Sequence, residues 1–339
     1  MYVLLALLLL GVLIMAHEAG HYLAARACGI EVQEFAMGMG PVLAKWKNKN
    51  GTQFSLRAFP IGGFCQFYGE DEALDDPRAF NNQKVFKRFL TVISGPAMNF
   101  IVAFAVIVFY LSAIGLYDTV PRVYAVEAYA AQAGLQAGDE LLLVNGTEIR
   151  ESSDVIAAVS ASEGKPVTLT VMRGKVQTDV VITPFYDEEA QRYRVGFTFD
   201  QERVRIPLMT SVPFSASYNL QSATIIFDTL KNLVTTGEGA DEVTGPVGTV
   251  YVIQEVTREG GLDIYMQLLS VISMNLGVMN LLPIPGLDGS RVLFLAYEAI
   301  RRKPVKREIE GAIHFAGFVL LMGLMLVLTY KDIMQIFVK

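Results

Sequence analysis

The alternation of apolar and polar stretches along the chain predicts four membrane-spanning helices. Residues 3–16 are apolar throughout, and a helix from about Tyr2 to Ala27 meets the roughly 20 residues that a bilayer core requires. Three further apolar runs occupy residues 89–117, 263–282 and 312–330. The pattern therefore indicates a polytopic α-helical membrane protein.

The third apolar run is broken. Pro283-Ile284-Pro285-Gly286 interrupts it before it resumes over residues 287–300, and Asp288 follows the break directly. Irregular backbone at membrane depth is tolerated where it is buried in protein or lines a cavity. We therefore expect this break to lie beside a site.

Residues 29–88 show short alternating runs separated by glycine and proline, which is a strand-and-turn pattern. Asn50-Gly51 predicts a hairpin turn. Residues 59–67 are apolar enough to re-enter the membrane as part of a β-hairpin loop, although a small soluble sheet fits the same pattern.

The rest of the chain predicts an inserted domain between two halves of a membrane core. Residues 120–200 show an α+β pattern with one amphipathic helix near residues 153–161. Residues 201–260 form a connecting region whose amphipathic helix, about 213–234, is expected to lie on the membrane or beneath the preceding domain. The core itself then comprises residues 1–117 and 261–339.

Composition supports a membrane location and excludes one class of partner. The 339 residues are 52% hydrophobic and 18% charged, which is apolar for a soluble protein. A net charge of −6 without a basic stripe excludes a nucleic-acid surface. Cys28 and Cys65 form no C-x-x-C pair and fall in one segment, so we expect no disulfide.

The N-terminal run has a second interpretation, as a secretory signal peptide. No Lys or Arg precedes it, and it carries His17, Glu18 and His21 before the small-residue stretch Ala25-Arg26-Ala27. We therefore expect a retained membrane helix.

Basic residues predict the orientation. They gather after the first helix and after the third, at Lys45, Lys47, Lys49, Arg57, Arg78, Lys84, Lys87, Arg88, Arg301, Arg302, Lys303, Lys306 and Arg307. Both loops should be cytoplasmic, which places the N-terminus, the inserted domain and the C-terminus outside.

The chemistry centres on His17-Glu18-Ala19-Gly20-His21. Residues four apart share a helix face, so the pattern presents two imidazoles with a carboxylate beside them, as zinc hydrolases do. The chain has three histidines, which argues against two ordinary core histidines meeting in this pattern by chance. Asp288 supplies a third ligand at a similar depth on the cytoplasmic side, and three protein ligands leave an open position for water.

Two other polar residues receive structural interpretations. His314 lies near the start of the fourth helix and is expected to snorkel or cap. Asn99, close to Ser94-Gly95-Pro96 in the second helix, is expected to hydrogen-bond a neighbouring helix rather than act directly in catalysis.

The combined motifs resemble the site-2 protease family of intramembrane zinc metalloproteases, above all its bacterial members that cut anti-sigma factors. The resemblance covers nearly the whole chain and rests on His17–His21, Asn280–Gly289, Gly38–Pro41, Pro60–Gly63, Gly95-Pro96 with Asn99, and Gly245–Gly248. It implies a bacterial cytoplasmic-membrane protein acting on single-span membrane substrates in the bilayer, such as anti-sigma factors or remnant signal peptides.

The resemblance also implies residue roles. His17, His21 and Asp288 would hold one Zn²⁺, and Glu18 would be the general base. Asn280, Pro283 and Pro285 resemble the family's substrate-handling residues, and residues 51–68, with Gly62, Gly63 and Phe64, resemble its membrane-reentrant strand loop.

The inserted domain has a resemblance of its own. Ala133–Asp139, the strand 141–144 and Asn145-Gly146 are similar to a circularly permuted bacterial PDZ domain. Such domains bind peptide C-termini by strand addition, and Val195, Gly196 and Phe197 would receive the carboxylate. A spacer domain that binds nothing is the alternative. One PDZ unit is visible, where some relatives have two.

Three alternatives come from other classes. A membrane PDZ scaffold with a vestigial or structural metal site would not need an intact Glu18. A transporter with a His and Asp relay should show an inverted repeat, which is not visible. A soluble zincin does not fit the hydropathy of the helix that bears the histidines.

Overall fold

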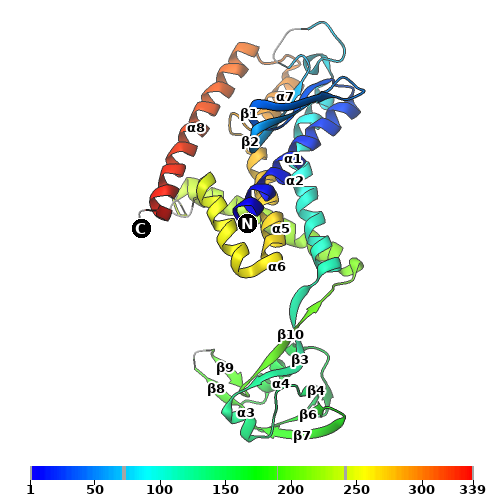
Figure 1. Ribbon diagram of the computed structural model, residues 1–339, viewed down its shortest axis with the longest axis vertical. Helices are drawn as coiled ribbons and strands as arrows, with labels where there is room; N and C mark the ends of the chain where they lie inside the picture. Colours follow the sequence, from blue (N-terminus) through cyan, green and yellow to red (C-terminus); the bar gives the residue numbers. More distant parts are fainter. Residues whose placement is uncertain (1, 71–73, 189, 240–242, 338–339) are drawn as a thin grey trace. The chain divides into compact units, whose positions relative to one another are not determined.

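The computed structural model describes residues 2–70, 74–188, 190–239 and 243–337, and these fall into two units. The membrane unit runs up to Ser112 and resumes at Pro207, and the β-rich unit is Ala113–Ile206. Figure 1 shows the helices and strands of each unit. The sequence-based range for the inserted domain, 120–200, lies inside the β-rich unit.

Within the described residues, four helices are long and apolar enough to cross a membrane. They are α1 (Tyr2–Cys28), α2 (Val85–Phe109) with the π-helical turn Tyr110–Ile114, α6 (Pro246–Leu281) and α8 (Arg307–Phe337). At about 1.5 Å per residue the 27 residues of α1 extend about 40 Å, which exceeds the hydrocarbon thickness of a bilayer. The prediction of four helices long enough to span is confirmed.

The second helix differs from its predicted range of 89–117. It begins at Val85, and its π-helical turn ends at Ile114, before strand β3 (Leu116–Val126) starts. Gly115 makes the transition with φ +85°, and a Cβ there would lie 2.6 Å from the carbonyl oxygen of Val204. The end of the helix is therefore fixed by the close approach of a strand, which hydropathy does not reveal.

The predicted connecting region, 201–260, is also corrected at its end. Residues from Pro246 onward already belong to α6, which has two arms that meet at Gly261 with φ +60° and ψ −144°. The second arm, 262–281, matches the predicted third span. In the first arm Ile253 packs against Leu9 and Leu13 of α1, so tertiary contacts make this less apolar stretch helical.

The first arm is anchored to α8. Asp332 is buried and accepts hydrogen bonds from the backbone amides of Gly245 at 3.1 Å and Gly248 at 2.7 Å. A carboxylate at a helix N-terminus satisfies otherwise unpaired N–H groups and the helix dipole. A Cβ at Gly248 would lie 2.7 Å from the carboxylate, which explains the glycine.

Helix α5 (Leu208–Thr235) packs on α2 and α6 with a small polar face. Ser211, Ser215 and Asn219 recur every four residues and are buried, whereas Leu220 and Phe227 are exposed. This polarity is the reverse of a soluble helix, so the exposed side of α5 is suited to lipid.

Shorter elements complete the membrane unit, including the 3-10 helical turn Phe80–Asn82. Strands β1 (Val32–Lys47) and β2 (Gln53–Phe67) form an antiparallel hairpin, and α7 (Asp288–Arg301) follows the broken segment. The hairpin turn is held by Asn48, whose Oδ1 accepts the amides of Asn50 and Thr52, and Gly51 adopts φ +87°. Figure 1 shows the hairpin, α7 and the C-terminal end of α1 close together.

The β-rich unit is an antiparallel sheet with two helices. The strand order is β10-β3-β4-β6-β7, with β5 paired to β4 and a separate pair β8-β9. The elements are α3 (Ala128–Gln132), β4 (Glu140–Val144), β5 (Thr147–Glu148), α4 (Ser152–Ala161), β6 (Val167–Arg173), β7 (Val176–Ile182), β8 (Phe185–Asp187), β9 (Arg192–Arg194) and β10 (Phe197–Val204). Its core joins Leu141, Leu169 and Val155, all at most 2% exposed.

Candidate active site

Three side chains from two distant segments converge inside the membrane unit. His17 and His21 lie one turn apart on α1 and are both buried. Their Nε2 atoms are 3.2 Å apart, and Oδ2 of Asp288, the first residue of α7, lies 3.1 Å from one and 3.2 Å from the other. The structure thus brings together the three residues that the sequence singled out as ligands.

This triangle fits a zinc ion. Zinc–ligand bonds of about 2.0–2.1 Å in a tetrahedron place neighbouring ligand atoms about 3.3 Å apart. Among the described residues, Oδ2 of Asp288 is buried without a hydrogen-bond partner of good geometry. Two imidazole nitrogens and a carboxylate oxygen are donors that zinc prefers, and a cation between them would satisfy all three.

Helix α2 supports both imidazoles from behind. Nδ1 of His21 lies 2.9 Å from the carbonyl oxygen of Thr91, and Nδ1 of His17 lies 3.2 Å from the side-chain amide of Asn99. Such contacts to the second ring nitrogen orient a ligating histidine and fix its tautomer. The sequence predicted that Asn99 contacts a neighbouring helix, but it did not identify His17 as the partner or the Thr91 carbonyl as the support for His21, because both contacts depend on how α1 and α2 pack.

Two glycines allow this packing. A Cβ on Gly20 would lie 2.2 Å from the carbonyl oxygen of Ser94, and a Cβ on Gly95 would lie 2.2 Å from Nε2 of His21. At the same contact, the Ser94 hydroxyl donates a hydrogen bond to the Gly20 carbonyl oxygen at 2.9 Å. The glycine at 95 therefore leaves the space that the imidazole occupies.

Glu18 faces the hairpin. A Cβ on Gly63 of β2 would lie 3.4 Å from Cγ of Glu18, and the backbone amide of Cys65 donates a hydrogen bond to the Glu18 carboxylate. Glu18, Phe64 and Asn280 line one cavity of about 390 Å³ together with the converging triad. A carboxylate thus borders the same cavity as the three ligand atoms.

The other predicted substrate-handling residues, Gly62, Gly63, Pro283 and Pro285, are not among the residues that line this cavity. Gly62 has φ +90°, and a Cβ there would lie 3.0 Å from the side chain of Met39 of β1. Pro283 lies in the segment between α6 and α7, and Pro285 packs against α8, where a Cβ on Gly317 would lie 2.2 Å from its carbonyl oxygen. Pro285 therefore determines how closely α8 approaches the broken segment.

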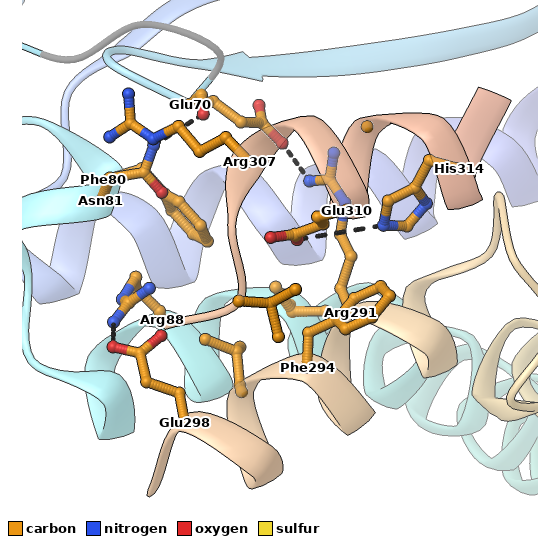
Figure 2. A pocket seen from close by; sticks show the side chains of 14 residues that line it. Glu70, Phe80, Asn81, Arg88, Arg291, Phe294, Glu298, Arg307, Glu310 and His314 are labelled. Atoms are coloured by element: carbon orange, nitrogen blue, oxygen red, sulfur yellow. Dashed lines mark hydrogen bonds and ion pairs between the residues drawn. The ribbon is translucent and has the colours of Figure 1, made fainter. Parts of the chain in front are cut away.

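A second, polar cavity of about 290 Å³ adjoins the first and shares Glu70, Val92 and Arg291 with it. Arg291, one turn after Asp288, pairs with Glu70, as Figure 2 shows. Neither residue was identified from the sequence, although the position of Arg291 on the Asp288 face of α7 was a usable signal.

His314 lines this polar cavity rather than joining the triad. Its Nδ1 accepts the backbone amide of Gly286 at 3.3 Å, and Glu310 lies 4.0 Å from its Nε2. In Figure 2 His314 and Glu310 of α8 lie above Phe294 of α7. The expected capping role fits this contact, since His314 fixes an amide of the broken segment.

The β-rich unit has a groove of about 290 Å³ between α4 and the segment from β9 to β10. Strand β10 ends the strand order of its sheet, so one edge of it is unpaired among the described strands. Val195 and Phe197, two of the predicted peptide-binding residues, line the groove opposite Val159. Gly196, between them, has φ +74°, a conformation that glycine adopts without strain.

Known proteins match nearly the whole chain. A profile described as peptidase family M50 matches residues 5–324. The zinc metalloprotease RasP of Bacillus licheniformis is 30% identical over 98% of this chain and 98% of that protein. The regulator of sigma-W protease RasP of Bacillus subtilis is 28% identical, also over 98% of each.

Among solved structures, the PDZ domain of an SdrC-like protein from Listeria monocytogenes matches 25% of this chain and 90% of its own length. The identity is 22% and the TM-score is 0.22.

Proposed function

Because this chain belongs to peptidase family M50, the site-2 protease family of zinc metalloproteases, we propose that it cuts single-span membrane proteins inside the bilayer. One observation carries the proposal: ligand atoms of His17, His21 and Asp288 lie 3.1–3.2 Å apart on membrane-unit helices, with Glu18 on the same cavity. That arrangement supports the proposal of a metallohydrolase active centre within the membrane unit.

In this proposal His17, His21 and Asp288 hold one Zn²⁺, which when bound supplies a water of lowered pKa and a Lewis acid for the scissile carbonyl. Glu18 accepts the proton of the attacking water and returns it to the leaving amine. The Cys65 amide keeps the Glu18 carboxylate directed into the cavity.

A transmembrane substrate hides its peptide bonds in helical hydrogen bonds, so it has to be unwound before it is cut. The β1–β2 hairpin offers a strand beside the triad, and Phe64 and Asn280 line the cavity. We assign substrate binding to β2 at Gly62, Gly63 and Phe64 and to Asn280, with the hairpin re-entering the membrane. Strand addition provides main-chain partners for the unwound segment. Pro283 and Pro285 shape the broken segment beside it.

The substrate class and location extend the proposal. The B. subtilis relative is named a regulator of sigma-W protease, so anti-sigma factors are the substrates we propose here, with remnant signal peptides second. The bacterial relatives favour a bacterial cytoplasmic membrane, and the basic loops favour an orientation with the active site toward the cytoplasm and the β-rich unit outside.

The groove of the β-rich unit supports a second binding function, the capture of peptide C-termini. An unpaired strand edge beside an apolar helix face is what strand addition requires. Val195, Gly196 and Phe197 would receive the terminal carboxylate. Occupancy of this groove would select which membrane proteins reach the active site.

The test uses the purified full chain in detergent with a single-span reporter. Glu18→Gln should bind zinc as tightly as the unmodified protein and fail to cut, and a chelator should stop cutting by the unmodified protein. Glu308→Gln changes an exposed glutamate of α8 and serves as the matched control. Normal turnover by Glu18→Gln, or cutting that persists in chelator, contradicts the mechanism.

A further inference from the structure

Asn99 is a fully enclosed polar side chain that contacts the site. It is 0% exposed, and its Nδ2 lies 3.2 Å from Nδ1 of His17. Its Oδ1 is buried and has no hydrogen-bond partner among the described residues. A buried amide oxygen without a partner costs free energy, so this arrangement calls for a physical explanation.

The chemistry of His17 supplies that explanation. Its Nε2 points at Asp288 and His21, so Nε2 is the nitrogen directed at the proposed metal position. A neutral imidazole that offers the Nε2 lone pair carries its proton on Nδ1, which is then a donor. The NH₂ group of Asn99 is also a donor, and two donors facing each other form no hydrogen bond.

Rotating the Asn99 amide by 180° resolves both problems at once. The oxygen and nitrogen of an asparagine amide have nearly the same shape, and their assignment follows from the hydrogen-bond network. After the rotation Oδ1 accepts the Nδ1–H of His17, and the buried oxygen gains its partner.

We propose that Asn99 is a positioning residue, whose Oδ1 accepts the Nδ1 proton of His17 and so holds that imidazole in its metal-binding tautomer. The proposal rests on the zinc site proposed above and assigns it a support that lies outside the ligand set. His21 receives the equivalent support from the Thr91 carbonyl, so α2 orients both histidines.

Helix packing alone does not account for the side chain. The contact of Asn99 with α6 is made by its backbone carbonyl, which accepts the Ser273 hydroxyl at 2.8 Å. The side chain instead points to α1, where its described hydrogen-bond contact is His17. Packing and imidazole support are thus carried by different atoms and can be tested separately.

The experiment measures the zinc affinity of the purified full chain by competition with a chromogenic chelator. Asn99→Leu removes the acceptor at similar volume, and we expect about 10- to 100-fold weaker zinc binding. Asn99→Asp keeps an acceptor oxygen and should bind close to the unmodified protein. Ser273→Ala disturbs the packing contact without touching His17, and its affinity should stay unchanged.

The measured zinc affinities decide whether Asn99 positions His17. Equal affinity of Asn99→Leu and the unmodified chain, or equal losses in Asn99→Asp and Asn99→Leu, overturns the positioning role. If Asn99→Leu fails to fold, judged by circular dichroism, Asn99→Ala makes the same comparison without added volume. An unmodified chain that binds no zinc contradicts the proposed metal site itself, so the two failures are distinguishable.

Discussion

Oδ2 of Asp288 lies 3.1 Å from Nε2 of His17, although the two residues belong to opposite ends of the chain. Asp288 reaches this position because α7 begins immediately after the broken segment, where Gly286 takes φ +96°. A Cβ on Gly289 would lie 2.3 Å from the carbonyl oxygens of Leu281 and Leu282, so the turn back from α6 is very tight. The geometry of the triad therefore depends on this turn as well as on α1.

Asp288→Asn tests the carboxylate as a ligand. Replacing one oxygen by an amide nitrogen removes the charge that draws the cation, so zinc affinity should fall by more than the roughly 10–100-fold typical of an outer-shell loss. Cleavage should be lost in parallel. Metal analysis after dialysis measures the first effect, and Asp228→Asn, an exposed aspartate of α5, is the control. Full zinc retention by Asp288→Asn would show that its carboxylate is not a ligand.

Gly95→Ala tests the space beside Nε2 of His21. The added methyl would lie 2.2 Å from Nε2 of His21, so the imidazole must move and zinc binding should weaken at least tenfold. Gly323→Ala on α8 is matched, because nothing lies within 4 Å of a Cβ there. Equal zinc affinity in both variants would contradict this prediction, since it would mean that α2 shifts to accommodate the methyl group without moving the imidazole.

Asp139 predicts an acid-dependent stability in the β-rich unit. Burial alone would raise its pKa, but the Arg173 guanidinium and the Gln136 amide hydrogen-bond its carboxylate and hold the pKa below its usual range. A carboxyl with a lowered pKa in the folded state stabilises above its unfolded value of about 3.9 and loses that contribution as pH falls further. Stability should therefore decline below about pH 4.

Asp139→Asn should remove part of this acid dependence and cost on the order of 1–2 kcal/mol at neutral pH. Hydrogen exchange of residues 113–206 in the full chain, followed across pH, measures both effects. Asp118→Asn changes an exposed aspartate of the same unit and should alter neither. An unchanged acid profile in Asp139→Asn would assign the pH dependence to other carboxylates.

The groove predicts a preference for free, apolar C-termini. Ile156, which is 41% exposed, lines it from α4, so Ile156→Glu should weaken binding of a peptide ending in an aliphatic residue by about tenfold or more, because the bound peptide would remove the new carboxylate from water. Ala157→Glu lies on the next face of α4, outside the groove, and is the control. Fluorescence anisotropy measures the affinity, and an amidated peptide that binds as well as the free acid would contradict carboxylate recognition.

Local sequence patterns predicted much of the architecture. Apolar runs located four long helices, and Asn50-Gly51 located the hairpin turn, because both depend on residues close in sequence. The two arms of α6 were not predicted as one element. The first arm is less apolar, and contacts of Ile253 with α1 stabilise it as a helix. Such long-range packing overrides local hydropathy.

The candidate site also has a part that local sequence patterns predict and a part that depends on packing between distant segments. His17 and His21 were visible as a helical spacing, and Asp288 as a charge after a broken span. Asn99 was expected to hydrogen-bond a neighbouring helix, but its partner His17 and the role of the Thr91 carbonyl were not predicted, because both groups reach α1 only through the close approach at Gly20 and Gly95. A buried asparagine in a membrane helix was the signal that deserved more weight.

The hydrogen bond between His21 and the Thr91 carbonyl has an evolutionary consequence. A main-chain oxygen is present whichever side chain stands at position 91, so no substitution there deletes the acceptor for His21. Mutations can therefore change the orientation of this imidazole only if they alter the backbone path or the volume of neighbouring side chains. Of the two histidines, His21 is the one whose orientation is protected against side-chain mutation at its supporting position.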